Sequence, residues 1–107
     1  MLKDTEFLLH QASRLGDVSR AEEILQLSPQ QAFVQDCDGR LPIHWAASSN
    51  SVDVVRLLVG LSGFDPDTQD ASGWSPLMIA ANVLNSDQIM SLLLAKGADI
   101  NQQSRQY

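Results

Sequence analysis

Two histidines and one cysteine are the side chains best suited to acid–base, nucleophilic or metal chemistry. Neither His10 nor His44 has a carboxylate or a second histidine three or four residues further along, the spacing that places two ligands on one helical face. Cys37 is the only cysteine, which excludes an intrachain disulfide and a metal site built from cysteines. We therefore expect both histidines to bond to backbone near helix starts, and we expect no enzymatic activity, cofactor or metal.

Other arrangements that carry chemistry are also missing from the sequence. No Ser-His-Asp ordering, glycine-rich phosphate loop or pair of catalytic carboxylates rises above chance. The remaining class of function is recognition of another molecule. Such a function depends on the elements that form the binding surface.

Composition limits the choice of partner. The chain has 107 residues, of which 44% are hydrophobic, and this predicts a single domain over residues 1–107. Its 13 acidic and 7 basic side chains give a net charge of −6, which argues against nucleic acid and favours a basic protein surface. No apolar run approaches the roughly 18 residues of a membrane span, and no signal-peptide pattern precedes the first element. We expect no membrane association and a cytoplasmic and nuclear location.

Two stretches of the chain are nearly the same sequence. Residues 36–47 read DCDGRLPIHWAA and residues 70–81 read DASGWSPLMIAA, with Pro42 and Pro76 at the same place. Both resemble the Thr-Pro-Leu-His-x-Ala signature of ankyrin repeats. The resemblance implies an all-α ankyrin-repeat solenoid of about three helix-turn-helix repeats, connected by β-hairpin loops.

This register divides the chain into repeats at approximately 2–35, 36–69 and 70–101, with residues 102–107 starting an incomplete hairpin. Each repeat has a short first helix with small residues and a second helix with an apolar stripe. The first repeat, with a polar outer face, is expected to cap the stack. A stack that ends at the third repeat is expected to expose part of the apolar stripe that contains Ile89 and Leu93, which predicts self-association through this uncapped end. A truncated longer array is the other interpretation.

Ankyrin stacks bind partners through their hairpin tips and the outer side of each first helix. The candidate protein-binding residues at these places are Lys3, Glu6, Arg14, Asp38, Arg40, Ser48, Ser49, Asp70, Ser72, Trp74 and Asn82. Trp74 is the leading anchor, because tryptophan dominates interface hot spots and a tip position offers the ring little core. Alternatively, Trp74 folds back on its own hairpin or on Arg40. Trp45 is expected to pack between repeats one and three.

The two similar stretches also resemble one ankyrin family more specifically. The tryptophans in GRLPIHWA and DASGWSP are not dictated by the fold, and both stretches look like the second and third repeats of gankyrin-type proteins, the assembly chaperones of the proteasome regulatory particle. The resemblance implies that the concave face binds the C-terminal domain of one regulatory-particle ATPase subunit, with Arg40 and Trp74 in the groove and Asp38 and Asp70 close by. Two alternatives remain open: an inhibitor of a cyclin-dependent kinase, and a generic ankyrin scaffold or fragment of a larger protein.

Overall fold

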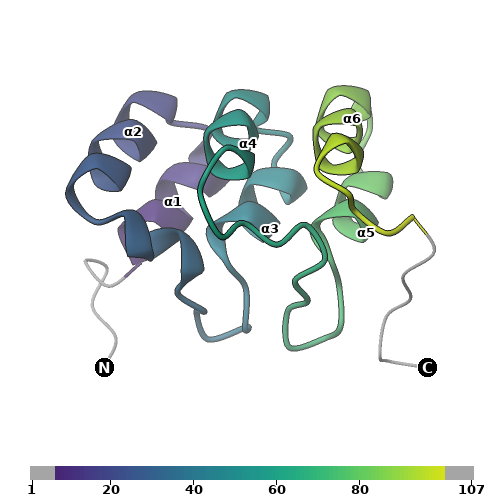
Figure 1. The fold of residues 1–107 in the computed structure, drawn as a ribbon, viewed down its shortest axis with the longest axis horizontal. Coiled ribbons are helices and arrows are strands. Elements are labelled where there is room, and N and C mark those ends of the chain that lie inside the picture. The colour runs from purple at the N-terminus through teal and green to yellow at the C-terminus, as the bar shows by residue number, and fades with distance from the viewer. Residues whose placement is uncertain (1–6, 101–107) are drawn as a thin grey trace.

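The computed structural model describes residues 7–100, and its helices form three successive pairs that stack in sequence order (Figure 1). The α-helices of these residues are α1 (Leu8–Leu15), α2 (Val18–Leu27), α3 (Pro42–Ser48), α4 (Val52–Val59), α5 (Pro76–Ala81) and α6 (Asp87–Ala95). A short 3-10 helix, η2 (Pro29–Phe33), follows α2. The described residues contain no β-strand, and the loops before α3 and α5 are hairpin-like turns. The predicted all-α solenoid is confirmed.

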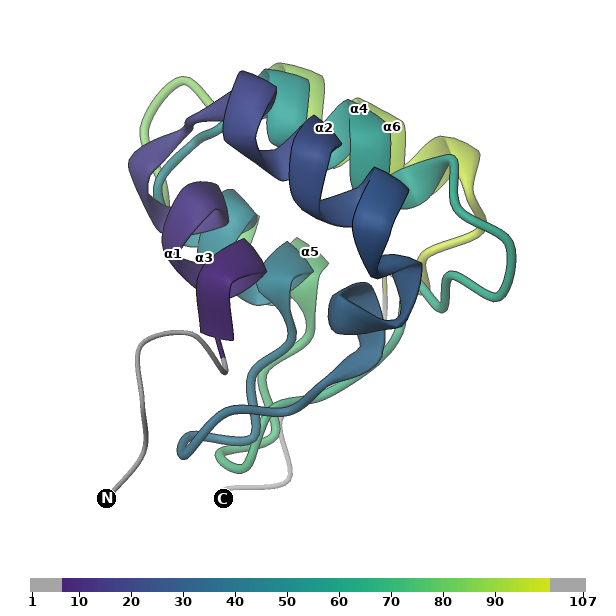
Figure 2. The same ribbon diagram turned by 90° about the vertical axis from the view of Figure 1, so that its left-hand side faces the viewer.

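The six helices form two rows (Figure 2). Helix α3 packs between α1 and α5, and α4 likewise packs against α2 and α6. Ala12, Ala46 and Ala80 are buried at the centre of the first row, where small side chains allow the helices to approach closely. Each predicted repeat range contains one helix of each row.

The first helices of repeats two and three start in different ways. Pro42 and Pro76 both occupy the first turn, where a missing amide hydrogen costs least. The imidazole Nδ1 of His44 then accepts from the amide of Leu41 at 3.0 Å, whereas the hydroxyl of Ser75 accepts from the amide of Met78 at 3.2 Å. Each repeat thus keeps one half of the threonine–histidine arrangement in the ankyrin signature.

The C-terminal repeat corrects one expectation. Ile89 and Leu93 are completely buried, so the exposed part of the predicted stripe does not include these two residues. Helix α6 packs against α4 and α5, and the side chains of both residues are covered within residues 7–100. The predicted self-association therefore loses the two residues on which it was based.

No helix among residues 7–100 is long and apolar enough to cross a membrane.

Candidate protein-binding face

The loops that precede α3 and α5 have the same backbone structure. In the first, the carboxylate oxygen Oδ1 of Asp36 accepts from the amides of Asp38 at 2.9 Å and Arg40 at 3.0 Å. In the second, Oδ1 of Asp70 accepts from the amides of Ser72 and Trp74, both at 2.9 Å. An aspartate at the start of each loop therefore fixes the loop tip by a local side-chain to backbone bond.

The two tips also contact each other. The amide of Ala71 donates to the carbonyl of Asp38 at 3.0 Å. A Cβ atom on Gly39 would lie only 2.7 Å from the Ala71 nitrogen, and Gly39 has a φ of +69°. Glycine is required here both by the left-handed backbone and by the close approach of the next tip.

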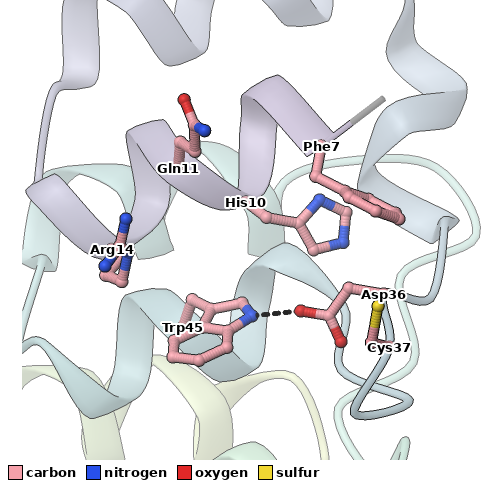
Figure 3. A pocket seen from close by; sticks show the side chains of 7 residues that line it. All are labelled: Phe7, His10, Gln11, Arg14, Asp36, Cys37 and Trp45. Carbon is pink, nitrogen blue, oxygen red and sulfur yellow. Dashed lines mark hydrogen bonds between the residues drawn. The ribbon is translucent and has the colours of Figure 1, made fainter. Parts of the chain in front are cut away.

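The second oxygens of the two aspartates bind different side chains. Oδ2 of Asp36 accepts from the indole Nε1 of Trp45 at 2.7 Å (Figure 3), and Oδ2 of Asp70 accepts from Nε of Arg40 at 3.1 Å. The Arg40 guanidinium carbon lies 4.8 Å from the ring centroid of Trp45, a cation–π distance. These contacts hold Arg40 between the second and third repeats.

The pKa of the Asp36 carboxyl reflects these bonds. Partial burial raises the pKa, but the hydrogen bonds from the Trp45 indole and from the Arg40 and Asp38 amides outweigh it, so the pKa lies below its ordinary value. Asp36 is therefore charged at neutral pH, as its role of acceptor for three donors requires.

Two hollows open beside these contacts and meet at Cys37. The first has a volume of about 250 Å³ and lies between α1 and α3 (Figure 3). It is lined by Phe7, His10, Gln11, Arg14, Asp36, Cys37 and Trp45. The second, of about 320 Å³, lies over the loop tips and is lined by Cys37, Asp38, Arg40, Asp70, Ala71, Ser72 and Trp74. We call the surface formed by both hollows the loop-tip face.

Four of the predicted residues remain candidates for partner contact on this face. Trp74 is exposed at 36% of its area and Arg14 and Asp38 are exposed, while Ser72 is half-buried. The indole that Arg40 covers is Trp45, and Trp74 lines the second hollow. Trp74 is thus the large hydrophobic side chain at the tip of the third repeat, as the register predicted, and its role in binding stays a prediction.

Two of the predicted residues instead stabilise the loop-tip face. Asp70 is only 8% exposed and its carboxylate accepts from three donors within the chain, and contact of this residue with a partner stays a prediction. Arg40 is held by Asp70, with 22% of its side chain exposed, which leaves part of the guanidinium accessible.

Three more predicted residues use their side chains within the chain. Ser48 donates to the carbonyl of Trp45 at 3.1 Å, and Ser49 donates to the carbonyl of Ser13 at 3.0 Å, linking the first and second repeats. Asn82 donates to the carbonyl of Met78 at 3.2 Å but remains exposed. Lys3, Glu6 and the start of the incomplete hairpin at 102–107 lie outside the described residues.

Trp45 and Phe7 are two of the lining residues that were not predicted as site residues. Trp45 was expected to pack between repeats one and three, and the structure shows it half-buried, lining the first hollow together with residues of the first repeat. The signal that could have placed it is the need of an indole N–H for an acceptor, which Asp36 supplies. Phe7 lies just before α1, and no feature of the sequence marks it.

Both histidines have the structural role that the sequence predicted. Nε2 of His10 donates to the carbonyl of Val34 at 2.7 Å, and Nε2 of His44 donates to the carbonyl of Thr68 at 3.1 Å. Burial is the main reason that the pKa of each imidazole lies below the ordinary 6.5. Both rings are therefore neutral links from a first helix to the loop at the end of its own repeat.

Among residues 7–100, no group of three or more His, Cys, Asp or Glu side chains is arranged to hold a metal ion. The chemistry that the loop-tip face supports is contact with another molecule through an exposed indole, a partly exposed guanidinium and carboxylates.

Comparison with known proteins agrees with the repeat structure. A family model of ankyrin repeats, in three copies, matches residues 9–104. A protein of Saccharomyces cerevisiae named "Probable 26S proteasome regulatory subunit p28" is 33% identical over 92 residues, which is 82% of this chain and 40% of that protein. The "26S proteasome non-ATPase regulatory subunit 10" of Dictyostelium discoideum is 31% identical over 86 residues, 80% of this chain and 37% of that protein.

Proteins of other kinds match as well. The human "Neurogenic locus notch homolog protein 1" is 32% identical over 96 residues, which is 90% of this chain but 4% of that protein. The chain spans about two fifths of the length of the two proteasome subunits that it matches.

Proposed function

The chain belongs to the ankyrin-repeat family, and on that premise we propose that this protein-binding module acts in assembly of the proteasome regulatory particle. In this proposal it holds the C-terminal domain of one ATPase subunit of the base on its loop-tip face. Two similar proteins are named as 26S proteasome regulatory subunits, which supports the link to the proteasome. We place this activity in the cytoplasm and nucleus, without an enzymatic step.

The observation that carries the proposal is Trp74 at the tip of the third repeat. The indole is 36% exposed, and its backbone amide is fixed by Asp70. A loop tip whose backbone is already fixed loses little conformational entropy on binding. Tryptophan and arginine are enriched at interface hot spots, and Trp74 and Arg40 line the same hollow.

Charge supports a basic partner. The chain carries a net charge of −6, and exposed Asp38 lies on the face beside Trp74. Complementary charges of this kind speed association and make it sensitive to salt.

Binding to individual regulatory-particle ATPase C-terminal domains, measured by isothermal titration calorimetry, tests the proposal. We expect Trp74→Ala to weaken binding by about 2 kcal/mol, the range of a hot spot. Leu27→Ala is the matched control, because Leu27 is 85% exposed on α2 in the other row of helices, and it should bind like the wild type. Arg40→Glu is unsuitable as a probe, because it would place a second carboxylate against Asp70.

Equal affinity of wild type and Trp74→Ala would contradict the role of the loop-tip face. Inhibition of a cyclin-dependent kinase, with no binding to any ATPase domain, would replace the proposed function by the regulatory alternative. Binding to neither would leave the module as a scaffold for a different partner and would also contradict the proposal.

A further inference from the structure

A third cavity lies between the first and second repeats, away from the loop-tip face. Its volume is about 190 Å³, and it is lined by Ala32, Phe33, Leu41, Ile43, Leu58, Gly63, Phe64, Asp65 and Thr68. These residues come from η2, the start of α3, the end of α4 and the loop that follows α4. In Figure 2 that loop, coloured teal to green, lies on the side of the molecule opposite α1.

The cavity wall is apolar where it is deepest. Ile43 and Leu58 are each 2% exposed and Ala32 is 6% exposed. The nearby carbonyl of Thr68 is already paired with His44, and the Asp65 side chain is exposed at the rim. An apolar cavity without free polar partners does not hold water well.

Phe33 forms the mouth of the cavity. Its side chain is 44% exposed, and a Cβ atom on Gly63 would lie 3.9 Å from the Cζ atom of Phe33. The ring therefore reaches from the first repeat to the loop of the second. A partly exposed ring held at its edge can turn aside, which gives a small molecule a route to the interior.

The next junction along the stack lacks this arrangement. Asp67 occupies the position of Phe33 in the 34-residue register, and its Oδ1 accepts from the amide of Asp99 at 2.8 Å. The second junction is thus joined by a hydrogen bond, whereas the first has an aromatic ring and an apolar space. The apolar cavity therefore lies at the junction that has the aromatic ring.

We propose that the cavity between the first and second repeats binds a small neutral aromatic molecule of one ring. The volume of the cavity indicates a ligand with one ring, since an apolar protein cavity of about 150 Å³ binds benzene. The lining decides the chemistry, because Phe33 and Phe64 offer ring contacts and the deep wall offers only aliphatic groups. A charged ligand would lose its hydration without gaining a partner.

Titration with toluene, followed by methyl chemical shifts in NMR spectra of the whole chain, tests this site. We expect saturable shifts at the methyl groups of Ile43, Leu41 and Leu58. Benzylammonium has the same ring with a charge, and we expect it to cause no saturable shift at these methyl groups. Shifts of equal size with both probes would indicate adsorption to the surface and would overturn the proposal.

A variant that fills the cavity gives the second test. Ala32→Leu adds three carbons at a buried lining position and should abolish the toluene shifts. Ala95→Leu adds the same carbons at an exposed position of α6 and should leave them unchanged. If Ala32→Leu does not fold, the comparison of toluene with benzylammonium on the wild type still decides the matter.

The site and the proposed function can fail separately. Toluene binding does not involve Trp74, so Trp74→Ala should bind toluene like the wild type. If toluene causes no saturable shift, and the same methyl groups shift only when an ATPase domain is added, the cavity receives a side chain of the partner and the small-molecule assignment is wrong.

Discussion

Asp36 and Asp70 start equivalent loops, but their side chains bind different partners. The comparison shows which bonds stabilise one repeat and which bonds join two repeats. Both fix their loop tips through Oδ1. The other oxygen of Asp36 binds Trp45 of its own repeat, whereas that of Asp70 binds Arg40 of the preceding repeat. The same residue in the same turn therefore has a local role at one position and a coupling role at the next.

Because Asp70 joins two repeats, we expect its substitution to cause the larger loss of stability. Asp70→Ala removes the acceptor of two amides and leaves the mostly buried Arg40 guanidinium without its partner. We expect the free energy of unfolding to fall by about 3 kcal/mol, measured by urea denaturation. Asp70→Asn, which can still accept from the two amides, should lose less. A loss below about 1 kcal/mol for Asp70→Ala would contradict the coupling role.

Because Asp36 binds only groups of its own repeat, we expect its substitution to cause a smaller loss of stability. Asp36→Ala leaves two amides and the Trp45 indole without their acceptor, but it leaves no charged side chain without a partner. We expect a loss of about 2 kcal/mol in the same urea experiment. A loss equal to or greater than that of Asp70→Ala would remove the distinction between the two loops.

The contact between the tips can be tested with glycines. Gly39 and Gly97 both have positive φ, of +69° and +93°, but only at Gly39 would a Cβ atom meet backbone, and no atom lies within 4 Å of one at Gly97. We expect Gly97→Ala to cost about 1 kcal/mol for the backbone conformation alone. Gly39→Ala should cost about 1 kcal/mol more, because the Ala71 backbone has to move. Equal thermal and urea stability of the two variants would contradict a close contact between the tips.

The smallest effect that we expect is a dependence of stability on pH. The pKa values of His10 and His44 are lowered in the folded chain, mainly by burial. The unfolded chain therefore takes up protons first, and the stability present above about pH 6.5 is lost as the pH falls below that value.

Urea denaturation at pH 7.5 and pH 5.5 measures this effect. The wild type should be less stable at pH 5.5, and His10→Gln,His44→Gln should show a weaker pH dependence. An equal change in the wild type and in the double variant would exclude the histidines as its source.

The sequence could predict the order of the helices and the place of Trp74, because a repeat of 34 residues fixes which positions are equivalent. It could not predict that Asp70 is buried, since its partner Arg40 comes from the preceding repeat and the stacking distance decides the contact. The orientation of Trp45 could not be predicted for a similar reason. Its neighbour Ala46 suggested packing between repeats, and the structure shows that the indole also turns toward the acceptor Asp36.

The burial of Ile89 and Leu93 also differs from what the helical pattern suggested. Their stripe was expected to be partly exposed at the end of the stack, and helical periodicity alone does not tell which neighbour a stripe faces. The structure directs it toward α4 and α5. The apolar cavity could not be predicted either, because Phe33 marks a departure from the repeat pattern without revealing the space behind it.

Contact of Trp74 with the partner is the central feature of the proposed function, and tryptophan fluorescence tests this contact directly. The chain has two tryptophans, so Trp45→Phe leaves Trp74 as the only indole. We predict that a regulatory-particle ATPase C-terminal domain that itself lacks tryptophan shifts the emission of this indole to shorter wavelength and protects it from acrylamide. A complex that forms while the emission and quenching of Trp74 remain unchanged would contradict the account.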